Sequence, residues 1–208
     1  TARIRLLTAS GAQDLEGGAA TIDAGTVLDI PLDGASAEPI AVSIDSDEPV
    51  VASIEEEWSG GAWPGSDAHW GILSALVPST SLTSAQIPGA DSLGKIVSSQ
   101  LGATPLRATS VATNSGGSDP TTKLLLALPE DSTDGSVDVE VGGHSTTVAA
   151  GSSVLLDLPS ADSRITASGA VRAAILLTAR TPNGTVRATW PIGTTGLAAR
   201  ESLVTVGP

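Results

Sequence analysis

The sequence predicts an all-β protein made of two tandem, related β-sandwich units with an immunoglobulin-like layout. Short segments rich in Val, Ile, Leu and Thr alternate with clusters of Gly, Pro, Asp and Ser, as expected for strands joined by turns. A helix of ordinary length is hard to place in the chain. The chain also matches itself at an offset of about 120 residues, which indicates a duplicated β-unit.

The expected strands are mostly four to seven residues long and end at turn residues. In the first half they cover 3–7, 26–32, 40–44 and 49–54. In the second half they cover 123–128, 136–141, 145–150, 153–158, 164–168, 171–177, 185–190 and 202–206. One short helix is predicted within 91–101, where Asp91 or Ser92 could cap its first turn.

Three matches carry the internal repeat. "RIRLL" matches "KLLLA", "IDAGTVLDIPL" matches "VAAGSSVLLDL", and "AHWGI" matches "ATWPI". The offset between copies changes only at turns, where insertions are tolerated. We therefore expect a first sandwich unit at 1–85, a connecting segment at 86–104 and a second sandwich unit at 105–208. The alternative is chance similarity between short aliphatic strands.

The repeat assigns different roles to the tryptophans. Trp70 and Trp190 occupy the same place in the motif Ala-x-Trp-x-Ile, so we expect both indoles to pack across a sandwich core. Trp58 and Trp63 have no counterpart in the second copy and lie in a Gly-rich loop. One further asymmetry is that Leu176 is apolar on an outward-facing position of the second copy, which predicts that something covers this face.

The Gly-rich loop supplies the candidate binding site. Indole faces stack on sugar rings and carboxylates accept hydrogen bonds from sugar hydroxyls, so the loop has the chemistry of a carbohydrate platform. The alternative is that its indoles fill the end of the sandwich or an interface. The candidate ligand-binding residues are Trp58, Trp63, Asp67, His69 and Glu57.

Charge and composition exclude several partners. The net charge of −13 argues against nucleic acid, because neutralising phosphates requires clustered Lys and Arg. No stretch approaches 18 consecutive apolar residues, so we expect no membrane insertion by this segment. Because the chain opens directly on a predicted strand, we expect it to be a processed part of a longer protein.

Metal and catalytic motifs are missing or isolated. The chain has no Cys, and His69 and His144 do not have the spacing of a zinc motif, so we expect no metal and no cofactor. Ser92 and Lys95 have the S-x-x-K spacing of serine acyl enzymes, without the accompanying motifs. The acidic runs at 45–48 and 130–135 are interpreted as solvated turns. We therefore expect no enzyme.

The "AGTVLDIPL" and "AGSSVLLDL" strands, with "PVVAS" and "GAVRAAILLTA", resemble the extracellular part of an uncharacterised family of secreted or membrane-anchored actinobacterial proteins, a domain of unknown function. The resemblance covers most of both predicted units. It implies an exported protein at the cell envelope whose signal or anchor lies outside this chain. It supplies no activity and no functional residues.

Together these observations predict a non-catalytic extracellular module of the cell envelope that contacts another protein or acts as a structural spacer. The alternative is a carbohydrate-binding module that uses the loop of Trp58 and Trp63. The expected partner is accordingly an envelope protein or a polysaccharide.

Overall fold

The computed structural model describes residues 1–31, 41–59, 69–75, 80–95, 121–181 and 184–193. Within these residues twelve strands form three antiparallel sheets, and 90–95 form a short helical segment. The prediction of an all-β fold is therefore confirmed.

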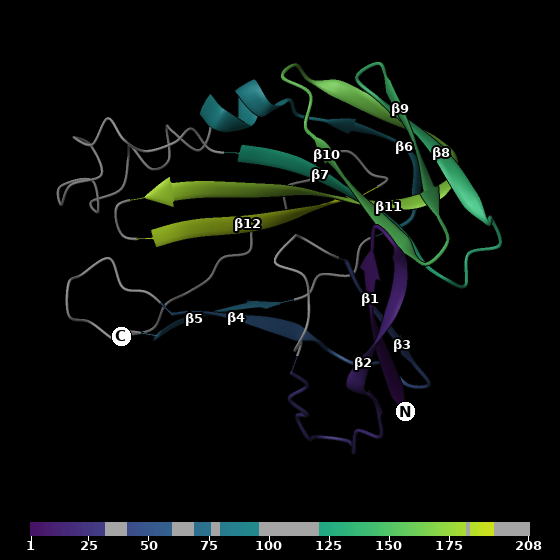
Figure 1. Ribbon diagram of the computed structural model, residues 1–208, viewed down its shortest axis with the longest axis vertical. Helices are drawn as coiled ribbons and strands as arrows, with labels where there is room; N and C mark the ends of the chain where they lie inside the picture. Colours follow the sequence, from purple (N-terminus) through teal and green to yellow (C-terminus); the bar gives the residue numbers. More distant parts are fainter. Residues whose placement is uncertain (32–40, 60–68, 76–79, 96–120, 182–183, 194–208) are drawn as a thin grey trace.

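The strands of the first half are β1 (Ala2–Thr8), β2 (Gly11–Ala20), β3 (Ala41–Ser46), β4 (Ser53–Ser59), β5 (His69–Ala75) and β6 (Leu82–Ile87). The strands of the second half are β7 (Thr121–Leu128), β8 (Ser136–Val141), β9 (His144–Ala149), β10 (Ser152–Asp157), β11 (Ser163–Thr181) and β12 (Gly184–Ile192). Figure 1 shows β7, β10, β11 and β12 above the three-stranded β2-β1-β3 sheet and the β4–β5 hairpin.

The largest sheet has seven strands and is organised around β11, which spans 19 residues. The first part of β11 pairs with β6 and β8, and its second part pairs with β7 and β12. The pairing with β6 is irregular between Thr166 and Val171, where β11 changes partners. Such an irregularity bends a strand and lets one sheet curve around its own core. The sheet is therefore close to a barrel.

One hydrophobic core lies inside this curved sheet. It contains aliphatic side chains from β6, β7, β8, β9, β11 and β12, together with Leu93 from the helical segment. Buried and exposed residues alternate strictly along β8, where Val137, Val139 and Val141 are buried and the residues between them are exposed. That is the pattern of a strand with one face on a core and one in solvent.

β7 departs from this alternation because both of its faces are buried. Leu124, Leu126 and Leu128 face the core of the seven-stranded sheet. Leu125 and Ala127 lie on the opposite face and are also buried. A consecutive apolar run is what a strand covered on both sides requires.

The N-terminal sheet contacts β10, the neighbour of β7, on the side of the sheet that the second face of β7 shares. Ser153, which pairs with Ala127, donates a buried hydrogen bond of 2.5 Å from its Oγ to the carbonyl oxygen of Leu7 in β1. The Cβ of Ala12 in β2 lies 3.4 Å from where a Cβ on Gly151 would be. Leu176, on the same face of β11, is partly buried, as the sequence predicts for a covered face.

The strand predictions are confirmed for β1, β3, β7, β8, β9, β10 and β12. The predicted strand 49–54 overlaps β4 only at 53–54, and the predicted strand 202–206 lies outside the described residues. Residues 26–31 of the predicted strand 26–32 are not a strand. β2 was not predicted, because "GAQDLEGGAA" has four Gly or Asp residues and little β-branched content. The two predicted strands 164–168 and 171–177 are parts of one strand, β11. The helix predicted within 91–101 is present at 90–95.

The arrangement as two tandem immunoglobulin-like sandwiches is not confirmed. The described part of the second half forms one near-barrel sheet, whereas the first half contributes a three-stranded sheet, a hairpin and β6. β6 includes residue 85, the predicted end of the first unit, and pairs with β11. The boundaries 1–85, 86–104 and 105–208 stay a prediction, and so does the internal repeat.

Candidate functional site

The predicted ligand-binding residues belong to the β4–β5 hairpin. Its register places Trp58 opposite Trp70, Ser59 opposite His69 and Glu57 opposite Gly71. The backbone therefore brings Glu57, Trp58 and His69 to the same end of the hairpin. Trp63 and Asp67 lie outside the described residues, so the complete site stays a prediction.

The equivalent hairpin of the second half has a different register. Trp190 lies opposite Ile175 in the β11–β12 pair, whereas Trp70 lies opposite Trp58. The predicted repeat also aligns "PVVASI" with "AVRAAI", and so Ile54 with Ile175, which would place Trp70 opposite Ile54. The two hairpins therefore differ by four residues in register.

The expectation that Trp190 packs inside the core is wrong, because 41% of this residue is exposed. Its cross-strand neighbour Ile175 is 2% exposed, so Trp190 lies on the core side of the sheet. Within the described residues β12 pairs only with β11. An indole on such an edge strand has a neighbouring strand on one side only, which leaves part of the ring in solvent.

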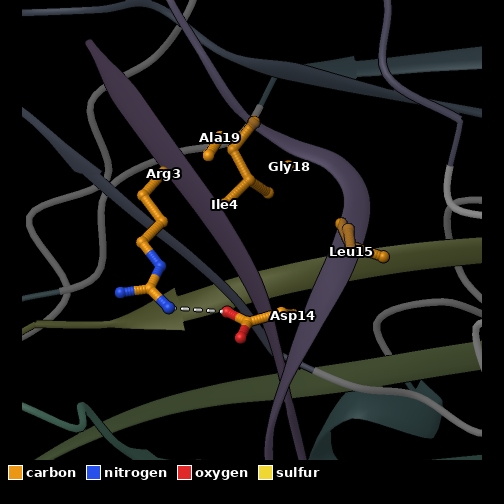
Figure 2. Close-up of a pocket in the computed structure, with 6 residues that line it drawn as sticks. All are labelled: Arg3, Ile4, Asp14, Leu15, Gly18 and Ala19. Carbon is orange, nitrogen blue, oxygen red and sulfur yellow. Dashed lines mark hydrogen bonds and ion pairs between the residues drawn. The ribbon is translucent and has the colours of Figure 1, made fainter.

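One hollow of about 390 Å³ lies between β1 and β2. Arg3 pairs with Ala19 and Arg5 with Asp14, so β2 has extra residues that bulge away from β1. Gly17 accommodates the bulge with a φ of 75°. Figure 2 shows the residues that line the hollow, which are Arg3, Ile4, Asp14, Leu15, Gly18 and Ala19.

The charged side chains around this hollow form ion pairs with one another. Arg3 Nη2 donates to Asp14 Oδ1 at 2.9 Å, which Figure 2 marks with a dashed line. Arg5 Nε lies 3.3 Å from the same oxygen, in an ion pair without hydrogen-bond geometry. Arg5 Nη1 also pairs with Glu130 after β7. This network joins the N-terminal sheet to the β7–β8 turn, so it stabilises the fold.

Glu130 is a turn residue whose side chain is 56% exposed, in agreement with the interpretation of 130–135 as solvated turn acids, and it also takes part in an ion pair. Its carboxylate is an ion-pair partner of Arg5, whose side chain is only 19% exposed. A partly buried guanidinium needs such a counter-charge, because desolvating a charge without a partner is costly. Sequence spacing could not reveal this pair, since the two residues lie 125 positions apart.

A second hollow of about 290 Å³ lies on the outer face of β8, β9 and β11. Its lining is polar apart from Val139 and Ala167. The residues are Asp138, Val139, Glu140, Ser145, Thr166, Ala167 and Ser168. Thr147 Oγ1 donates to Asp138 Oδ1 at 2.7 Å, and the backbone N–H of Asp138 donates to Ser168 Oγ at 3.0 Å. The alternation in "SVDVEV" was a sequence signal for this outward-facing pair of carboxylates.

The S-x-x-K serine has a structural role. Ser92 Oγ donates to Asp162 Oδ1 at 2.8 Å, and the backbone N–H of Gly89 donates to the same oxygen at 2.8 Å. A Cβ at Gly89 would lie 2.3 Å from backbone atoms of Ser160 and Ala161, so the close approach requires glycine. Asp162 thus caps the start of the helical segment from the β10–β11 connection.

His144 begins β9 and is exposed, next to a turn in which Gly142 and Gly143 have positive φ. This confirms the predicted hairpin turn. Among the residues that the structure describes, no group of three or more His, Asp or Glu side chains could hold a metal ion.

Comparison with known proteins identifies the family. A model described as a family of unknown function, DUF5719, matches residues 1–133. The chain belongs to this family. No curated protein and no solved structure matches the chain.

The DUF5719 match includes β1 to β7 and ends before β8. Two of the strands within it, β6 and β7, pair with β11, which lies outside the match. The matched segment therefore shares its sheet and its core with the rest of the chain. In the part of this DUF5719 protein that is described, no helix has the length and apolar character needed to cross a bilayer.

Asp162 gives a pH-dependent prediction. The backbone N–H of Gly89, and then the Ser92 hydroxyl, lower the pKa of the Asp162 carboxyl from its ordinary value of 3.8. A lowered pKa in the folded state stabilises the fold above the unfolded value, and this contribution is lost as pH falls through the folded value. The unfolding free-energy difference between wild type and Asp162→Asn should be constant from about pH 5 to 7 and shrink below about pH 4.

Urea unfolding of both proteins across this pH range measures the effect. Ser92→Ala removes one of the two donors, so it should reduce the pH-dependent part without abolishing it. A difference that is the same at pH 3 and pH 7 would contradict the role of Asp162 as a charged cap.

Proposed function

We propose that this DUF5719 protein is a non-catalytic extracellular module of the cell envelope that contacts another protein or acts as a structural spacer. The proposal includes an actinobacterial source and an exported location, which follow from the resemblance in sequence. It also includes the internal repeat, with two tandem immunoglobulin-like sandwich units that derive from it.

The observation that carries the proposal is the open three-stranded sheet. In the described residues β2 and β3 each pair only with β1, so both edges of this sheet have unpaired backbone groups. Such edges add strands from other chains, which is a common way for β-modules to bind partners. Asp45 and Glu16 are exposed on these edge strands, and edge charges suppress indiscriminate pairing.

The use of hydroxyl groups also supports a non-catalytic role. Ser152 donates to the carbonyl of Ala149, Ser153 donates to the carbonyl of Leu7, and Ser92 donates to the capping Asp162. A serine nucleophile needs a base that accepts its proton and a free path to substrate. These serines instead hold turns, sheets and a helix start in place.

Photo-crosslinking in the source cells tests the contact role. A photoreactive residue in place of Asp45, on edge strand β3, should give a discrete higher-mass adduct on illumination of intact cells. The same residue in place of Asp91, on the exposed helical segment, is the matched control and should give much less. Protease added to intact cells should digest the protein if it is outside. Protection from protease, with no adduct from either position, would contradict the proposal.

The alternative is a carbohydrate-binding module that uses the β4–β5 loop. The supporting observation is the hairpin register, which places Trp58 opposite Trp70 at the end where Glu57 and His69 also lie. The directly opposed positions of Trp58 and Trp70 share one face of the hairpin and are a suitable base for a sugar platform, whereas positions 57 and 69 alternate to the other face.

Tryptophan fluorescence separates the two functions. Under the carbohydrate alternative, soluble envelope polysaccharide fragments should cause a saturable change that Trp58→Ala/Trp63→Ala removes without lowering thermal stability. Trp190→Ala, at an exposed indole on a different hairpin, is the control and should keep the response. No response with any fragment, together with a lower melting temperature of the double variant, would contradict the carbohydrate alternative.

A further inference from the structure

The outer face of the curved sheet is polar across four adjacent strands. These strands run in the order β9, β8, β11 and β6, and their inward-facing side chains form the core. No large apolar side chain is exposed on this outer face. Its side chains are Ser145 and Thr147 on β9, Asp138 and Glu140 on β8, Arg164, Thr166 and Ser168 on β11, and Ser84 and Gln86 on β6.

Glu140 lies in a cross-strand row of hydroxyl groups. The register places Ser145 opposite Glu140, Glu140 opposite Thr166, and Thr166 opposite Ser84. Directly opposed residues have Cβ atoms about 4.5–5.5 Å apart, so these side chains form one continuous row of acceptors. The hollow of about 290 Å³ lies over this row and the neighbouring Asp138.

None of the ion pairs formed among the described residues involves this row. Arg3 and Arg5 pair with Asp14 and Glu130, and Lys123 pairs with Asp157. Arg164 is on the same outer face, but its Nε and Nη2 donate to the side-chain oxygen of Gln86 when that amide is oriented to satisfy both groups. Asp138 and Glu140 therefore contribute two exposed negative charges without an ion-pair partner among the described residues.

We propose that the outer face of β9-β8-β11-β6 binds a basic, extended segment of a partner protein that carries Lys or Arg at alternate positions. The inference rests on the proposed contact role and names the chemistry of the partner. Charge complementarity carries it, because a chain of net charge −13 presents here two carboxylates among hydroxyl acceptors.

The spacing of the two carboxylates selects an extended partner. Asp138 and Glu140 are two residues apart on β8, so they point to the same face about 6.6 Å apart along the strand. An extended segment repeats its side chains on one face with the same spacing. Lysines at positions i and i+2 would each meet one carboxylate. An ammonium group has three donors, which the carboxylate and the hydroxyls of Ser145 and Thr166 can accept.

Two synthetic peptides test the spacing. Both contain two lysines with threonine and glycine at the other positions and have capped ends. One has the lysines two positions apart, and its isomer has them adjacent, so that they point to opposite sides of an extended chain. Titration of the full chain, followed by amide chemical shifts, should show tighter binding of the first peptide, with the largest shifts at 138–140, 145–147 and 166–168. Equal binding of the isomers would overturn the proposal.

Two charge-matched double variants test the location. Asp138→Asn/Glu140→Gln keeps side-chain size and the acceptor for Thr147, and should weaken binding of the first peptide about tenfold or more, the scale of a lost charge-pair contact. Asp23→Asn/Glu48→Gln removes the same charge from exposed positions elsewhere and should change it less than about twofold. Equal weakening by both would overturn the proposal, since general attraction would then explain the binding.

The two proposals fail separately. If the peptides bind without site dependence while the crosslink from Asp45 forms in cells, the contact role stands and this docking face is wrong. If the peptides bind as expected but the protein is protected from external protease, the face stands and the envelope location is wrong.

Discussion

The two-sided burial of β7 is the constraint on which the rest of the structure depends. Leu124, Leu126 and Leu128 fill the core of the curved sheet, whereas Leu125 and Ala127 need cover on the other face. Leaving a leucine in water would forfeit about 1.5–3 kcal/mol. On this side of the sheet the N-terminal sheet contacts the neighbouring strand β10, where Ser153 donates a hydrogen bond to the Leu7 carbonyl. The first half of the chain is thus needed to complete the second.

This docking explains how the charged residues are distributed. Arg5 lies beside the junction and is balanced by Glu130 and Asp14, so this cation of β1 serves the contact between the sheets. The hollow between β1 and β2 is bordered by the same ion pairs and belongs to the fold. On the outer face of β8, Asp138 and Glu140 are exposed carboxylates without such ion-pair partners among the residues that the structure describes. The proposed contacts therefore use the edges of the N-terminal sheet and the outer face of β8.

The sequence predicts the parts of the fold that depend on local pattern. β8 was evident from its strict alternation, and the turn before His144 from two consecutive glycines. Local sequence pattern does not predict features that depend on contacts between residues far apart in the chain. The strand β2 is stabilised by pairing with β1 despite a weak intrinsic preference, and β6 joins a sheet whose central strand begins 76 residues later. Trp190 shares a motif with Trp70, but its exposure depends on its place at the edge of a sheet. Of the candidate site, sequence and register together place Glu57, Trp58 and His69 on one hairpin end.

Native-state hydrogen exchange of the full chain tests most directly whether the two halves form one cooperative unit. Amides of β1, such as Leu7, and of β7, such as Ala127, should open with the same free energy, equal to that of global unfolding. Ser153→Ala leaves the Leu7 carbonyl without its buried donor and should lower both values together by about 1–3 kcal/mol. If β1 instead exchanges at a lower free energy and the substitution changes β1 alone, the N-terminal sheet is an independent unit and the account is contradicted.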